Sequence, residues 1–142
     1  RDRLLSRFSP SAVQKVRIEI AGEAPAVLVK QGDLWRMTAP KNQMAKVWKV
    51  DAVVRPFASL RVDGWKTDNA TKKNRQEWLL DPWSRRVVIY GAKDAVLADV
   101  RIGNLSDEDH VFATTANDSR VGVIPVRKIR AFPQRVQDLL TD

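Results

Sequence analysis

The sequence contains no cysteine, one histidine and six glycines, which lie singly along the chain. Without cysteine, the chain has no disulfide, no thiol nucleophile and no thiolate metal ligand. A Ser–His catalytic pair would have to use His110, and no serine lies in a strained nucleophile turn. No glycine-rich phosphate-binding loop is present either. These absences predict a protein that is not an enzyme and that holds no cofactor.

Long apolar runs are also missing. The longest contain about four residues, whereas roughly 20 are needed to cross a bilayer. No secretory signal is visible. The chain begins with Arg1 rather than Met, so we expect a piece of a longer protein with a targeting or anchoring segment upstream.

The composition that is present is that of a soluble globular domain. Hydrophobic residues make up 44% and charged residues 30% of the 142 residues, which suits one folded domain. The 25 Lys and Arg exceed the 17 Asp and Glu, giving a net charge of +8. Such an excess attracts nucleic acid or an anionic membrane, or serves only as a solubilising surface.

Residues 27–57 organise the chain. Alternating residues predict strands at 27–30 and 34–37, joined by a tight turn at Gly32. Pro40 ends the second strand, and Asn42 is then expected to cap an amphipathic helix. The apolar face of that helix is predicted from Val47, Val50, Val54 and Phe57. Pro56 should end or kink the helix near Arg55, and Trp35 and Trp48 should both join its core.

Further strands are predicted at 15–21, 86–90, 95–102, 110–115 and 120–124. A final helical segment is expected to begin at Pro125, break at Pro133 and resume to Leu140. Residues 1–14 are interpreted as a connector from an upstream element, with a docking turn of the domain as the alternative.

An internal echo suggests two related units. Residues 17–22 (RIEIAG) and 26–28 (AVL) recur 69 positions later as 86–91 (RVVIYG) and 95–97 (AVL). Repetition would explain the match, and so would chance, because hairpin–helix units share similar spacing.

The predicted fold class is α+β, with antiparallel, hairpin-rich sheet in two related units, each with a helix packed on one face. The predicted units are residues 15–62 and 81–142, joined by a polar linker at 63–80, within one compact domain.

Two clusters of side chains are candidate sites. Residues 107–110 (DEDH) are consecutive, and neighbouring side chains on a loop cannot all face one ion, so a solvated loop rather than a metal site is predicted. The second cluster, the Trp–cation surface, comprises Trp65, Lys66, Lys72, Lys73, Arg75, Trp83 and Arg85, with Trp78 and Arg86 nearby. Such residues could stack bases and neutralise phosphates. The alternative is that the tryptophans bridge the two units while cations lie at the edge.

Several short motifs resemble the bacterial "domain of unknown function 4340" family over roughly residues 13–142. The matching segments are 35–40 (WRMTAP) with the helix after it, 78–82 (WLLDP), 87–89 (VVI), 102–103 (IG), 110–112 (HVF) and 121–123 (VGV). The resemblance implies an extracytoplasmic domain behind a membrane anchor, associated with ABC-type transport or gliding-motility components. It implies no catalytic residues.

Two functions follow as hypotheses. The first is a non-catalytic interaction module of a membrane-anchored, extracytoplasmic (periplasmic) protein, whose partner is a membrane protein or transporter subunit. The alternative is a soluble basic domain that binds nucleic acid through the Trp–cation surface.

Overall fold

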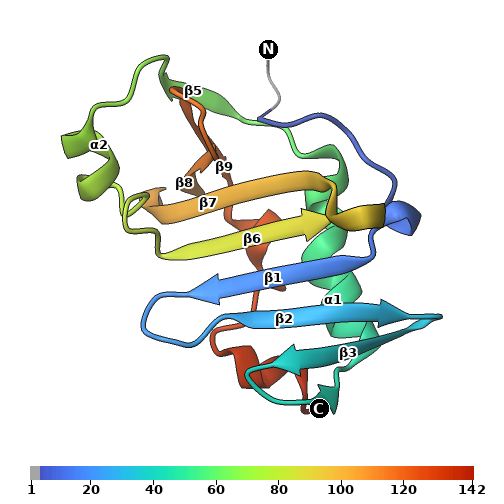
Figure 1. Cartoon of the computed structure of the whole chain (residues 1–142). Helices are drawn as coiled ribbons and strands as arrows, with labels where there is room; N and C mark the ends of the chain where they lie inside the picture. Colours follow the sequence, from blue (N-terminus) through green and yellow to red (C-terminus); the bar gives the residue numbers. More distant parts are fainter. Residues whose placement is uncertain (1–3) are drawn as a thin grey trace.

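In the computed structural model, which describes residues 4–142, the chain forms an antiparallel sheet with two α-helices (Figure 1). Within those residues the nine strands follow the order β4-β3-β2-β1-β6-β7-β8-β9-β5. The strands are β1 (Lys15–Ile20), β2 (Ala26–Gln31), β3 (Leu34–Ala39), β4 (Gln43–Met44), β5 (Gly64–Thr67), β6 (Arg85–Tyr90), β7 (Val96–Asp107), β8 (His110–Thr115) and β9 (Val121–Pro125). The helices are α1 (Val47–Val54) and α2 (Lys72–Glu77). The predicted α+β class with antiparallel strands is confirmed.

Alternating sequence explains the sheet. In β1, Val16 and Ile18 are fully buried, whereas Arg17 and Glu19, which alternate with them, lie on the opposite face. The turn between β2 and β3 uses Gly32 with φ of +63°, a conformation that glycine adopts without steric cost. Both features agree with the predicted strands.

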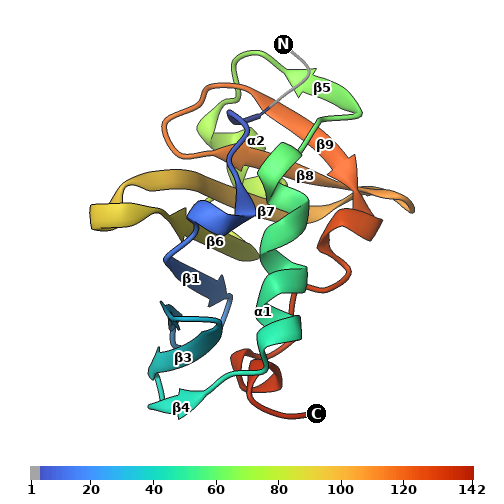
Figure 2. The same cartoon turned by 90° about the vertical axis from the view of Figure 1, so that its right-hand side faces the viewer.

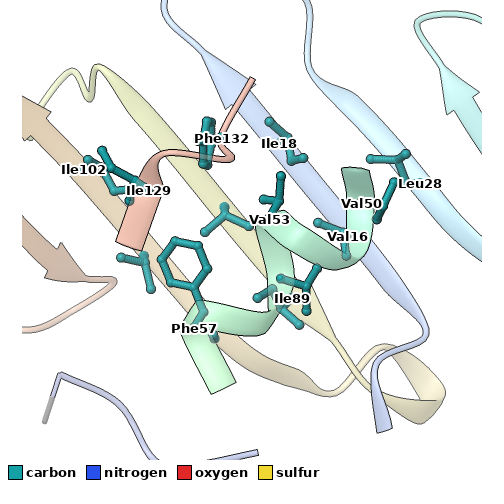
Figure 3. Packing of buried hydrophobic residues seen from close by; sticks show 14 of the residues in the cluster. Val16, Ile18, Leu28, Val50, Val53, Phe57, Ile89, Ile102, Ile129 and Phe132 are labelled. Atoms are coloured by element: carbon teal, nitrogen blue, oxygen red, sulfur yellow. The ribbon is translucent and has the colours of Figure 1, made fainter. Parts of the chain in front are cut away.

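Helix α1 packs against one face of the sheet, called here the α1 face (Figure 2). Val50, Val53 and Phe57 are each at most 2% exposed and meet sheet residues such as Ile18 and Ile89 (Figure 3). Full burial of each such side chain is worth about 1.5–3 kcal/mol. A 3₁₀ turn, Arg55–Ser59, follows the helix directly, so the predicted end near Arg55 is confirmed.

The predicted start of this helix is wrong. Residues 43–44 first pair with β3 as β4, and α1 begins only at Val47. Asn42 does not cap it; its side chain accepts a hydrogen bond from Arg36 Nη1 at 3.0 Å. The preference of Asn for a cap position is overridden here by local strand pairing.

The final helical segment forms as two 3₁₀ turns, Val126–Ile129 and Val136–Leu139. The predicted break at Pro133 lies between them, but the turns are shorter than the prediction implied. Prolines at 125 and 133 leave only short stretches, and helices of so few residues do not offset their nucleation cost. The segment still contributes Ile129, Phe132, Val136, Leu139 and Leu140 to the core.

The opposite face has a smaller second core. Leu80, Phe112 and Val121 are buried there, and the Trp78 ring stacks on Phe112 with centroids 4.7 Å apart. The segment predicted as a linker, 63–80, contains β5, which pairs with β9, and α2, which begins with a Thr71 capping box.

Part of the segment predicted as a connector packs on the domain. Leu4 and Val13 are buried, and the Phe8 N–H donates to the Ala58 carbonyl at 3.1 Å. Residues 1–3 of that segment lie outside the described residues.

Candidate functional site

The outward side of α1 presents an exposed tryptophan. Trp48 is 64% exposed, so the prediction that it joins the core is wrong. Its neighbour one helical turn on, Ala52, shares this side because residues four apart lie on one helix face. Val50 and Val53 occupy the side toward the sheet. An indole that is mostly in water on a well-packed helix is a candidate contact residue.

A hollow of about 270 Å³ adjoins Trp48. We call it the Trp48 hollow; it is lined by Trp48, Lys49, Ala52, Ala131, Phe132, Pro133, Gln134, Asp138 and Leu139. Its walls are largely apolar. The volume is slightly below the roughly 300–1,000 Å³ of small-molecule pockets, which favours one inserted side chain over a larger ligand.

The two walls of the hollow are tied together at the start of α1. The Lys46 N–H donates to the Leu139 carbonyl at 2.8 Å. Lys49 Nζ donates to the carbonyl of Asp138 at 2.7 Å and to that of Thr141. These bonds fix the C-terminal segment beside the start of α1, and Figure 2 shows the two backbone segments next to each other. The hollow is therefore a formed feature of the surface.

Lys49 also gives the hollow a polar rim. Its Nζ lies 5.5 Å from the centre of the Trp48 ring, within cation–π range. A lysine ammonium has three N–H donors, and two of them reach carbonyl oxygens here. The third can meet an acceptor on a partner.

The structure does not gather the Trp–cation surface into one patch. Trp65 and Lys66 lie on the edge strand β5, and the Arg120 guanidinium lies 4.5 Å from the Trp65 ring centre. Lys72 and Lys73 are exposed on α2. Arg75, on the same helix, donates through Nη2 to the Asp118 carbonyl at 2.6 Å.

Trp83 belongs to a polar network on the face opposite α1. Its Nε1–H donates to Glu19 at 3.1 Å, and the guanidinium groups of Arg86 and Arg101 lie 5.0 and 4.8 Å from its ring centre. Arg86 also bonds Glu19 and makes a two-point contact with Asp99 at 2.9 and 2.8 Å. These carboxylates raise the pKa of Arg86. The indole is thus engaged by the protein itself.

Arg85, the last member of that surface, lies on the other face from Trp83. Its guanidinium lies 5.6 Å from the centre of the Phe132 ring, at the end of the main core. Sequence reasoning grouped the two residues because they are close in sequence. Trp83 precedes β6 and stacks with Arg86, whereas Arg85 and Arg86 are successive strand residues and point to opposite faces.

His110 forms a cluster that the sequence did not predict. Its Nδ1 lies 2.9 Å from Asp107, and its Nε2 lies 2.8 Å from Asp63, which is 47 residues away in the chain. Hydrogen bonds to Asp107 and Asp63 raise the pKa of His110, and the bond from His110 lowers the pKa of Asp107. Both ring nitrogens of His110 are hydrogen-bonded. The side chain therefore connects the β7–β8 turn to the segment before β5, and we call this connection the His110 clip.

Comparisons with protein-family models, with curated proteins and with solved structures gave no match. Within residues 4–142, no group of three or more His, Asp or Glu side chains could hold a metal ion. The same part of the chain has no helix that is long and apolar enough to span a bilayer.

Proposed function

We propose that this chain is a non-catalytic protein-interaction module that binds its partner through Trp48 and the hollow beside it. The observation on which this depends is a 64% exposed indole next to a preformed apolar hollow. Tryptophan, with tyrosine and arginine, is enriched among the residues that dominate binding energy at interfaces.

The surface indicates the chemistry of the partner. An apolar side chain fits the hollow, and a carboxylate or carbonyl beside it would accept the remaining N–H of Lys49. The net charge of +8 favours an acidic partner, because opposite charge speeds encounter.

Co-purification from the native cells tests the proposal. Trp48→Ala should lower recovery of the partner, since loss of such a residue costs about 2 kcal/mol or more, which is roughly thirtyfold in affinity. Leu34→Ala is the matched control, because Leu34 is also exposed, at 51%, but lies at the β2–β3 turn. Equal recovery with both variants would contradict the proposal.

The location and the partner class are proposed from the resemblance described above. We propose a domain on the extracytoplasmic face of the cell membrane, anchored in the full-length protein, whose partner is a transporter subunit or another membrane protein of the cell envelope. Protease treatment of intact spheroplasts tests this: a domain outside the membrane should be digested, and a cytoplasmic domain should survive.

We also propose that the sheet consists of two related units. The strands run outward from the centre as β1, β2, β3, β4 on one side and as β6, β7, β8, β9 on the other, where β5 is added at the edge. The central strands β1 and β6 contain the echoed sequence, and Ile18 pairs with Val87, its equivalent 69 positions later. This register supports an approximate two-fold relation between the units. Separately expressed fragments 1–68 and 69–142 should then associate into a folded complex.

Nucleic-acid binding through the Trp–cation surface has less support. Stacking on bases needs free aromatic faces. Trp78 is stacked on Phe112, and Trp83 lies between Arg86 and Arg101. Arg85 lies on the other face of the sheet, so the seven residues do not form one track.

A further inference from the structure

An open groove of about 620 Å³ lies at one end of the main core, beside the start of β6. We call it the Arg85 groove; it is lined by Ser84, Arg85, Gly103, Asn104, Leu105, Val111, Val126 and Ile129. Its volume falls in the range of ligand pockets, about 300–1,000 Å³. It is distinct from the Trp48 hollow.

The groove contains one cation without a carboxylate partner. Among residues 4–142, the Arg85 guanidinium has no ion pair, and its contact is the ring of Phe132 at 5.6 Å. The side chain is half-buried, and this burial lowers the pKa of the guanidinium. An arginine nevertheless stays charged in proteins. A half-buried charge without a counterion is a group that gains most from binding an anion.

The neighbouring arginine, Arg86, differs because it has carboxylate partners. Arg86 is bonded to both Glu19 and Asp99 on the opposite face. In the part of the chain that the structure describes, Arg85 has no such pair, and none of the eight lining residues is acidic. The positive charge of the groove is therefore not neutralised by the described residues and is available to an anionic ligand.

Apart from Ser84 and Asn104, the rest of the wall is apolar. Leu105 is 59% exposed at the mouth, whereas Val111 and Ile129 are 5% and 6% exposed at the base. Val126, partly buried, completes this wall. Such a surface favours a hydrocarbon segment next to the charged group.

We propose that the Arg85 groove binds a small monocarboxylate with an apolar tail, the carboxylate on Arg85 and the tail along Leu105, Val111 and Val126. A carboxylate matches the planar guanidinium fork in a two-point contact. A single lining cation matches a single negative charge better than the two charges of a phosphate monoester. This proposal does not rest on the proposed interaction through Trp48.

Calorimetric titration with octanoate tests it directly. We expect saturable binding of octanoate, with 1-octanol, which has the same tail without charge, binding about tenfold to a hundredfold more weakly. Arg85→Gln should weaken the binding of octanoate by a similar factor and leave the binding of 1-octanol unchanged. Arg85→Lys keeps the charge but loses the planar guanidinium. Its affinity for octanoate should therefore lie between that of the parent and that of Arg85→Gln. Leu105→Asp should weaken both ligands.

Lys72→Gln is the matched control for charge, because it also removes one cation but lies on the exposed surface of α2. It should leave octanoate binding unchanged, and so should Trp48→Ala. Equal losses in Arg85→Gln and Lys72→Gln would indicate general electrostatic attraction and overturn the proposal. No saturable octanoate binding at millimolar concentration would overturn it as well. Tighter binding of an apolar tripeptide with a free C-terminus would assign the groove to a peptide chain instead.

Discussion

Gly103 in β7 lies against the segment that contains Trp78 and Leu80. Gly103→Ala therefore tests the packing of the second core. A Cβ on Gly103 would lie 2.0 Å from the Trp78 carbonyl oxygen and 3.1 Å from Leu80 Cδ2. Ordinary contacts of a Cβ are at 3.4 Å or more, so the segment over β7 has to move by more than about 1 Å, and a backbone atom cannot rotate away.

The displacement has two costs. Overpacking of this kind costs about 1–3 kcal/mol. Moving the Trp78 carbonyl also strains its hydrogen bond from the Asn104 N–H, at 3.0 Å, which is worth about 1 kcal/mol. Together we expect a loss of about 2–4 kcal/mol in the free energy of unfolding, with weaker stacking of Trp78 on Phe112.

Urea unfolding followed by tryptophan fluorescence and circular dichroism measures this loss. Gly64→Ala is the matched control, because its new Cβ would have Val123 Cγ2 at 3.8 Å as its nearest neighbour. Gly64 lies in the extended strand β5, and the alanine also restricts the unfolded chain, so it should change stability by less than about 1 kcal/mol. If Gly103→Ala unfolds at the same urea concentration as Gly64→Ala, the close contact between Gly103 and the Trp78 carbonyl is refuted.

Three further predictions concern the polar clusters and the basic charge. Trp83→Ala should lower the free energy of unfolding by about 2 kcal/mol or more, because it removes the bond to Glu19 and the ring between two guanidinium groups; an unchanged urea midpoint would show that the ring is not packed. For His110, whose pKa is raised in the folded state by Asp107 and Asp63, the protonated form is stabilised by folding, so its contribution is full below about pH 6.5 and is lost as the pH rises through the folded pKa. The melting temperature of His110→Gln should therefore fall short of the parent by more at pH 6 than at pH 9, and a pH-independent difference would contradict the clip. An oligonucleotide should bind with micromolar or weaker affinity near 150 mM salt, as to a general basic surface; submicromolar binding that disappears with Trp83→Ala would favour the nucleic-acid hypothesis.

The strands were predictable because their signal is local. In β1 and β6, alternating apolar residues and flanking turn residues give the element and its buried face. Gly32 likewise gives the turn between β2 and β3, since only the neighbouring residues decide it.

The predictions fail where contacts between residues distant in sequence determine how a side chain is placed. The apolar character of Trp48 suggests a core position, but α1 buries Val50, Val53 and Val54, and this orientation places Trp48 on the outward side. The bond between His110 and Asp63 joins residues that no pattern links. The Arg85 groove depends on which face Arg85 occupies and on the C-terminal segment packed beside it.

In the proposed function, Trp48 and its hollow contact a protein partner. Replacing Trp48 with a photo-crosslinking phenylalanine derivative in the natural full-length protein, in its own cells, tests this most directly. The same substitution at Leu34, which is 51% exposed, controls for random contact. We predict one discrete crosslinked membrane protein from position 48, absent from position 34. No crosslink at 48, or the same products from both positions, would contradict an interface at α1.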